Sequence, residues 1–234
     1  MKTIVFAVAV SLFVAFSARA EDNAVITGKI TLTGTPPPES AIDLDGTPDC
    51  KKLHAAALKT RRYIVGAGGE LANCFVYIKD GLAKQYAAPA QAAKLDQKAC
   101  LYVPYVLGVQ LGQDIDISNS DTFLHNVHYI GLQKEENFAQ LGGKKDVRKF
   151  AKPEIMVKFK CDVHPWMFAY VGVVAHPFYA VTNEKGQFKI SGLPAGKYTV
   201  EVWHLKAGVT TATVEVKEGA TVTQDFTLKV PEGK

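Results

Sequence analysis

Methionine and several cofactor motifs are scarce or missing in this chain of 234 residues. After Met1 only Met156 and Met167 occur, which argues against an open, methionine-rich copper-storage or chaperone site. The sequence contains no Cys-x-x-Cys-His for haem attachment, no His-Cys-His for a second copper centre, and no Ser/His/Asp or paired-carboxylate signature. We therefore expect a binding or carrier protein and not an enzyme.

Long apolar runs are missing after the first twenty residues. Those residues combine Lys2, an apolar run from Ile4 to Phe16, and the small-residue site Ala18-Arg19-Ala20. This pattern predicts a secretory signal peptide at 1–20 that is cleaved near Ala20, and no membrane span. We expect a periplasmic or secreted protein.

Strong charge of one sign is also missing. The formal net charge is +4, and loss of Lys2 and Arg19 with the signal lowers it to +2. This balance gives no reason to expect a nucleic-acid partner. The basic run 144–149 predicts a solvated loop, with a docking patch for an acidic redox partner as the alternative.

Most of the remaining chain reads as short strands separated by turns. Residues 25–33 alternate apolar and polar side chains, and 106–110 and 114–118 flank Gly112 like a hairpin. One helix is expected near 50–59, and 83–94 is a loop or a weak helix. The fold class is therefore all-β, a sandwich or barrel.

Four cysteines are present, and an oxidising compartment favours pairing. If Cys161 binds a metal, Cys50, Cys74 and Cys100 are left for one disulfide and one free thiol. The sequence does not decide the pair. We favour Cys50 with Cys100, because Cys74 adjoins an apolar strand and suits a buried position.

Cys161, His164 and Met167 occur at three-residue intervals between two predicted strands. An electron-transfer copper site needs two imidazoles and a thiolate with a weak axial thioether, so this loop can supply three ligands. His125, in the turn before another strand, is the fourth candidate. His128 is interpreted as a strand residue near the site. Asn126 is expected to tie the two segments together.

The runs Leu-His-Asn-Val-His (124–128) and Phe-Lys-Cys-Asp-Val-His-Pro-Trp-Met (159–167) resemble the cupredoxins, particularly the amicyanin type. The resemblance implies one type 1 copper ion held by His125, Cys161, His164 and Met167, with Asn126 as the tie between the loops. It also implies a redox protein partner, such as a cytochrome or a dehydrogenase. The segment Lys134–Lys152 departs from it as a long basic insert.

Residues 178–230 resemble the carboxypeptidase regulatory-like domain, a prealbumin-like sandwich that is also described as carbohydrate-binding-like. Its first strands would match 26–30 and 73–79, so we hypothesise that the cupredoxin-like Greek-key sandwich is inserted into it. The expected division is a signal at 1–20, an N-terminal β segment at 21–97, a copper domain at 98–177 and a regulatory-like sandwich at 178–234. The whole resembles secreted proteins of the methylamine-utilisation-like type.

Two other functions are considered beside electron transfer. One is a carbohydrate- or cell-surface-binding sandwich with a structural metal, with a glycan as partner. The other is a periplasmic copper chaperone or store. Zinc is a weaker choice than copper, because a thioether is a poor zinc ligand.

Overall fold

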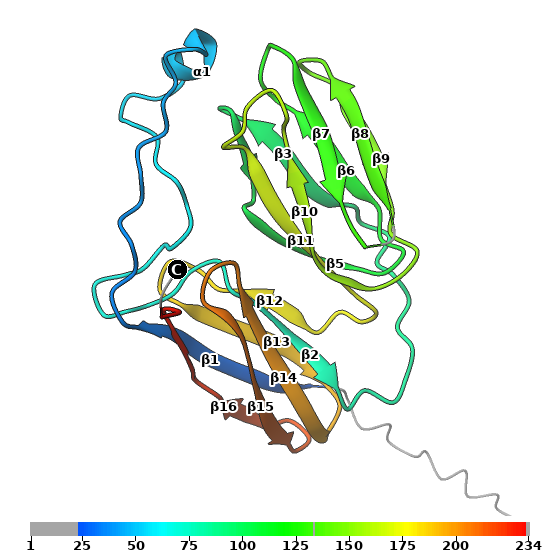
Figure 1. The fold of residues 1–234 in the computed structure, drawn as a ribbon. Coiled ribbons are helices and arrows are strands. Elements are labelled where there is room, and N and C mark those ends of the chain that lie inside the picture. Colours follow the sequence, from blue (N-terminus) through cyan, green and yellow to red (C-terminus); the bar gives the residue numbers. More distant parts are fainter. Residues whose placement is uncertain (1–22, 133, 233–234) are drawn as a thin grey trace, which may run out of the picture.

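The computed structural model describes residues 23–132 and 134–232, and shows two β-sandwiches, one above the other in Figure 1. Strands make up nearly all the regular structure, which confirms the all-β prediction. The predicted signal peptide lies outside the described residues. No helix within the described ranges has the length and hydropathy of a membrane span.

The lower sandwich is formed by strands from the N-terminal and C-terminal parts of the described chain. One sheet has the order β13-β1-β16, with β17 also on β1, and the other has the order β12-β2-β14-β15. The strands of both sheets are β1 (Ala24–Thr33), β2 (Phe75–Asp80), β12 (Tyr179–Val181), β13 (Gln187–Leu193), β14 (Gly196–His204), β15 (Gly208–Val216), β16 (Thr221–Thr223) and β17 (Phe226–Lys229). The first two strands thus pair with C-terminal ones, as the insertion hypothesis requires.

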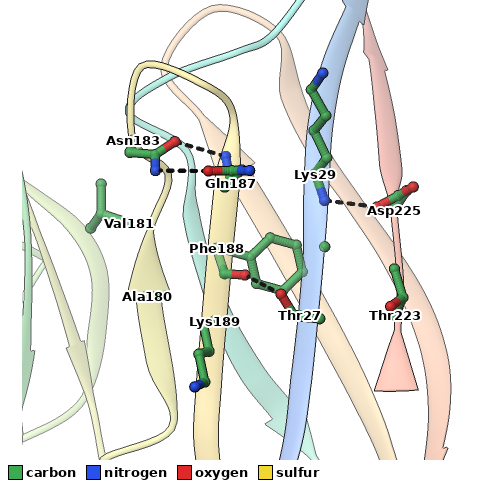
Figure 2. Close-up of a pocket in the computed structure, with 11 residues that line it drawn as sticks. Thr27, Lys29, Ala180, Val181, Asn183, Gln187, Phe188, Lys189, Thr223 and Asp225 are labelled. Atoms are coloured by element: carbon green, nitrogen blue, oxygen red, sulfur yellow. Dashed lines mark hydrogen bonds between the residues drawn. The ribbon is translucent and has the colours of Figure 1, made fainter. Parts of the chain in front are cut away.

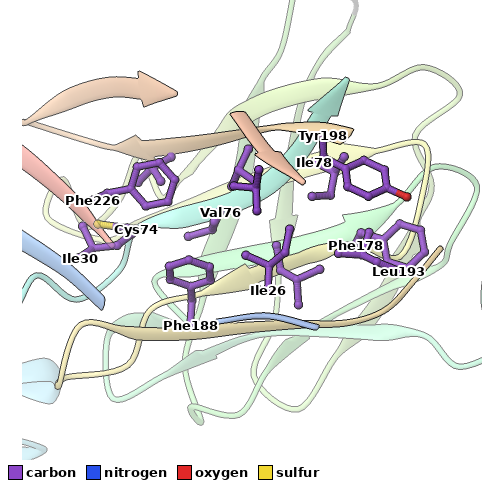
Figure 3. Close-up of a cluster of buried hydrophobic side chains, with 14 of the residues drawn as sticks. Ile26, Ile30, Cys74, Val76, Ile78, Phe178, Phe188, Leu193, Tyr198 and Phe226 are labelled. Atoms are coloured by element: carbon purple, nitrogen blue, oxygen red, sulfur yellow. The ribbon is translucent and has the colours of Figure 1, made fainter. Parts of the chain in front are cut away.

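The core of the lower sandwich follows from the alternation in β1. Every second side chain of this strand is buried, because successive residues point to opposite faces of a sheet. Ile26 and Ile30 lie in this core with Phe188 from β13 and Phe226 from β17 (Figure 3). The free thiol of Cys74 is buried in the same cluster.

The upper sandwich is formed by the middle of the chain. Its sheets have the orders β5-β11-β10-β7-β8 and β4-β3-β6-β9. The strands are β3 (Ala93–Lys98), β4 (Leu101–Val103), β5 (Val106–Gln110), β6 (Ile115–Asn119), β7 (His125–Ile130), β8 (Glu135–Gln140), β9 (Lys145–Arg148), β10 (Glu154–Lys160) and β11 (Phe168–Val174). The predicted domain boundaries stay predictions, although β3 spans the one at 97/98.

Three expectations about local structure were wrong. β5 and β6 do not form a hairpin around Gly112, because β5 pairs with β11 and β6 with β3 in the other sheet. The basic run 144–149 is not a loop, since it contains β9. Two of its lysines pair with acids before and on β6, Lys145 with Asp116 and Lys149 with Asp114. The helix expected near 50–59 is only α1 (Pro48–Lys52), which starts earlier.

Residues 34–72, which we call the strap, connect β1 to β2 by a long excursion. In Figure 1 the strap rises beside the upper sandwich and carries α1 at its far end. A disulfide between Cys50 of α1 and Cys100 of the β3–β4 turn fastens it there, as predicted. The strap therefore belongs in sequence to the lower sandwich but is attached covalently to the upper one.

The two sandwiches meet through a separate apolar cluster centred on Phe75 of β2. The Phe75 ring needs the space left by a glycine on β11. A Cβ atom placed on Gly172 would lie 2.6 Å from that ring, closer than real Cβ contacts come. This close packing holds the sandwiches against each other.

Candidate metal centre

The loop 161–167 connects the antiparallel strands β10 and β11, whose last pair is Lys160 with Phe168. The Cys161 N–H donates to the Met167 carbonyl at 3.0 Å, and the Met167 N–H donates to the His164 carbonyl at 2.9 Å. These two bonds close the loop tightly on itself. Cys161 and Met167 are both buried in the core of the upper sandwich.

β7 brings His125 to this loop, because β7 pairs with β10. The Nδ1 atoms of His125 and His164 are 2.9 Å apart, and the Cys161 sulfur lies 3.6 Å from the His164 Nδ1. All three ligand atoms lie within 4.8 Å of one another, and all three residues are buried. The structure thus brings together three of the four predicted ligands and places Met167 in the same closed loop.

Burial determines the charge of the His164 imidazole. Desolvation, together with the nearby His125, lowers the pKa of His164 to about 4. The imidazole is therefore neutral near pH 7 and offers a lone pair. Neutral imidazole is the form that binds metals.

Asn126 connects the two segments that carry the ligands. Its Oδ1 accepts the Asp162 N–H at 2.6 Å, and its own N–H donates to the Cys161 sulfur at 3.5 Å. Its Nδ2 donates to Asn137 of β8 at 2.6 Å. These contacts fix the distance between β7 and the loop, and they direct a backbone N–H at the Cys161 sulfur.

Asp121 is a residue of this site that the sequence reasoning missed. Its Oδ2 is 2.8 Å from the His125 Nε2, the ring nitrogen opposite the cluster. The same carboxylate accepts the backbone N–H groups of Ala99 and Cys100 at 2.7 and 2.9 Å. Asp121 therefore orients His125 and connects it to the turn that holds the disulfide. The sequence signal that could have indicated this role is the position of the carboxylate, four residues before the candidate ligand His125.

The other histidines lie outside the cluster. His128, on the same strand as His125, contacts Asp162 through Nδ1 and Glu135 through Nε2, at 2.8 and 2.7 Å. Both of its ring nitrogens are therefore engaged. His54 of the strap contacts the Ala99 carbonyl in the β3–β4 turn, and His176 and His204 have their contacts in the lower sandwich.

The donor set decides which ions suit the cluster. Cys100 lies close enough to His125 and His164 to appear in alternative ligand groups, but its sulfur is bonded to Cys50. The available soft donors are the Cys161 thiol and the Met167 thioether, beside two imidazoles. This combination fits copper, because thiolate and thioether favour Cu(I) while imidazole also suits Cu(II).

Apolar side chains surround the metal loop at the surface. Leu124, just before His125, and Val163, just before His164, are both exposed, and so is Pro165. His164 itself is only 5% exposed, so it lies just beneath this rim. Trp166 packs beside it, with ring centroids 5.4 Å apart.

The lower sandwich has a polar hollow of about 670 Å³ across β1 and β13 (Figure 2). Much of its polar surface is already paired. Thr27 donates to the Phe188 carbonyl, and Asp225 accepts the Lys29 N–H. Phe188 is buried, so its ring offers little face on which a sugar could stack. The glycan partner stays a prediction.

The model of the carboxypeptidase regulatory-like domain matches residues 165–229. No curated relative matches the chain at a significant level. Among solved structures, a purple cupredoxin from Nitrosopumilus maritimus is 23% identical, with a TM-score of 0.31, over 35% of this chain and 98% of that one. A Cu(I) amicyanin variant is 21% identical, with a TM-score of 0.33, over 42% of this chain and 97% of its own.

A copper-containing nitrite reductase from Thermus scotoductus is 21% identical, with a TM-score of 0.32, and the match covers 38% of this chain but only 25% of the reductase. The family model thus returns one of the two families that the sequence resembles, the carboxypeptidase regulatory-like domain. The assignment of a metal to this chain rests on its own side chains.

Proposed function

We propose that this chain is a mononuclear copper protein that carries single electrons outside the cytoplasm. The observation that supports this most is the convergence of the His125 Nδ1, the His164 Nδ1 and the Cys161 sulfur within 4.8 Å, in a buried and closed loop. Bound copper would supply one-electron chemistry. Cys161 and the two histidines would be its strong ligands, with Met167 as the weak axial ligand.

The surroundings of the ligands favour a carrier over a catalyst. Asn126 and Asp121 hold the ligands from behind, so the site is fixed before metal binds. Rigid ligands keep rearrangement small when an electron arrives or leaves. Trp166 and the loop itself cover the site, which leaves little room for a substrate to reach the metal. We therefore propose no enzymatic activity.

The partner we propose is a redox protein that docks on the rim of Leu124, Val163 and Pro165. His164 lies between Val163 and Pro165 in the chain and is 5% exposed, so we propose it as the exit for the electron. An exposed apolar patch is typical of an interaction site. The basic run 144–149 is a weaker docking candidate, because Lys145, Arg148 and Lys149 already pair with acids of the same chain.

The test is addition of Cu(II) to the purified protein with a record of its visible spectrum. We expect one copper per chain and an intense band from the copper–thiolate bond, and both should be lost in Cys161→Ser. Cys74→Ser is the matched control, because Cys74 is an equally buried free thiol in the other sandwich. A colourless protein, or a band that survives in Cys161→Ser, would contradict the proposal.

A further inference from the structure

A cavity of about 410 Å³ lies between the strap and the metal loop. Its volume falls in the range typical of small-molecule sites. The two walls differ: the strap contributes mostly charged side chains, and the upper sandwich contributes aromatic and apolar ones. The lining residues are Ile42, Asp43, Lys59, Thr60, Arg61, Arg62, Leu101, Pro165, Trp166 and Phe168.

The strap wall carries a surplus of positive charge. Lys59, Arg61 and Arg62 line the cavity, whereas Asp43 is the single acid among the lining residues. In the described parts of the chain, none of these three cations has a carboxylate within the 4.0 Å of a salt bridge. The nearby Glu39 is occupied by the Thr60 hydroxyl and by backbone N–H groups. The cavity therefore has a net attraction for anions.

Arg61 shows most directly that a counter-charge is missing. It is half-buried, and its guanidinium lies 4.4 Å from the centroid of the Tyr105 ring. Its hydrogen bonds to the Tyr102 carbonyl are long, at 3.4 and 3.5 Å. Removing a cation from water without an anion beside it costs free energy. A carboxylate in the cavity would offset that cost through charged hydrogen bonds.

The opposite wall suits a flat ring. The Trp166 Nε1 donates to the Cys100 carbonyl at 3.1 Å, which fixes the orientation of the indole. Phe168 and Pro165 line the cavity beside it. Aromatic rings stack on such surfaces at offset or edge-to-face angles with a gain beyond simple burial.

We propose that this cavity binds a small planar aromatic carboxylate. The carboxylate would face Lys59, Arg61 and Arg62 on the strap, and the ring would pack on Trp166 and Phe168. Asp43 opposes the same ligand through like charge. The disulfide between Cys50 and Cys100 holds the strap close enough to the metal loop for both walls to contribute.

Trp166 links the cavity to the metal centre. Its ring lies between the cavity and His164, with centroids 5.4 Å apart. A redox-active aromatic ligand bound here would be separated from a metal ligand by one side chain. This link rests on the proposed function, whereas the binding itself does not.

The test is calorimetric titration of the metal-free full-length protein with benzoate. Benzamide keeps the ring without the charge, and cyclohexanecarboxylate keeps the charge without the planar ring. We expect benzoate to bind more tightly than either. Equal affinity for all three compounds, or no measurable heat with millimolar benzoate, would overturn the proposal and leave the copper proposal untouched.

Variants then place the ligand. Lys59→Gln and Arg62→Gln remove exposed charges without removing a described contact, and each should raise the Kd for benzoate about two- to fivefold. Asp43→Asn should lower it. Lys185→Gln, an exposed lysine of the lower sandwich, should leave it unchanged. A Kd that does not respond to the strap variants, or that responds equally to Lys185→Gln, would place binding elsewhere and refute the assignment.

Discussion

Cys74 and Cys161 are both buried free thiols, 0% and 1% exposed, in two β-sandwiches of the same chain. In the lower sandwich Cys74 lies in an apolar cluster, and its thiol has the Thr182 hydroxyl and, at 3.8 Å, the Leu71 carbonyl beside it. Burial there raises the pKa of the Cys74 thiol to about 12. In the upper sandwich Cys161 has the His164 imidazole and the Asn126 N–H beside it.

Burial alone therefore does not make a cysteine a ligand. A thiolate needs donors or cations near the sulfur, and a metal needs further ligand atoms directed at the same point. The strap connects two strands of the lower sandwich, but its disulfide ties it to the upper one, next to His164. The following predictions test how far this difference between the sandwiches extends.

The largest effect is expected from removal of the disulfide. Cys50→Ala with Cys100→Ala opens a loop that spans 50 residues, and the entropy released in the unfolded chain should lower the free energy of unfolding by about 4 kcal/mol. Chemical denaturation measures the loss, with Cys74→Ala as a control.

Amide hydrogen exchange shows where the loss falls. Exchange should accelerate more in β3 and β4, next to Cys100, than in β14 and β15 of the lower sandwich. Equal acceleration in both would mean that the sandwiches unfold as a single unit. The disulfide would then not stabilise the upper sandwich more than the lower one.

The next effect concerns Asp121, the carboxylate behind His125. Asp121→Asn replaces a charged acceptor that also holds the turn at Ala99 and Cys100, and we expect copper affinity to fall roughly 10- to 100-fold. Competition with a chelator measures this. Glu201→Gln is the matched control, because Glu201 is a buried carboxylate of the lower sandwich, held by Tyr77 and Lys79. A similar loss in both variants would argue against a specific role for Asp121.

A smaller effect is expected where the sandwiches meet. Gly172→Ala places a methyl group 2.6 Å from the Phe75 ring and 2.8 Å from the Met156 methyl group, and overpacking of this kind costs about 1–3 kcal/mol. Thermal unfolding measures the loss. Gly46→Ala on the strap is the control, because nothing in the described structure lies within 4 Å of the added atom. Partial recovery in Gly172→Ala with Phe75→Leu would confirm that the clash is the cause.

A graded effect of pH is expected, to which both sandwiches contribute. Burial lowers the pKa of His164 in the upper sandwich and of His204 in the lower one to about 4, from an ordinary value of 6.5. The unfolded chain thus takes up these protons first. The metal-free protein should lose stability as the pH falls from 6.5 toward 4, by up to about 1.4 kcal/mol per pH unit for each histidine.

Denaturation midpoints measured between pH 7 and pH 5 test this, since most carboxylates remain charged there. His164→Gln and His204→Gln should each flatten the slope. A slope that neither substitution changes would assign the pH dependence to other groups.

Much of the site could be predicted because its information is local. The spacing of Cys161, His164 and Met167 within seven residues, between two apolar strands, indicates a ligand loop wherever the loop lies. The His125-Asn126 pair carries similar local information. The role of Asp121 could not be predicted in this way. It depends on contacts with the β3–β4 turn, which only the folded chain brings next to Asp121.

Parts of the fold escaped prediction for the same reason. Gly112 lies in a reversal between β5 and β6, but whether the two strands pair or enter separate sheets depends on partners far away in the chain. The run of basic residues at 144–149 favoured a solvated loop when the sequence was considered alone. Its place along a sheet edge depends on β6 and on the acids Asp114 and Asp116, with which two of its lysines pair.

The sequence by itself determined the all-β class, the metal loop and the resemblance to two families, because strand alternation and ligand spacing are properties of short segments. The tertiary structure decided which atoms meet: the two Nδ1 atoms beside the Cys161 sulfur, the carboxylate behind His125, and the strap fastened over Trp166. Those contacts join segments far apart in the chain, and they form only because β7 pairs with β10 in the upper sandwich and because the disulfide between Cys50 and Cys100 fastens the strap there.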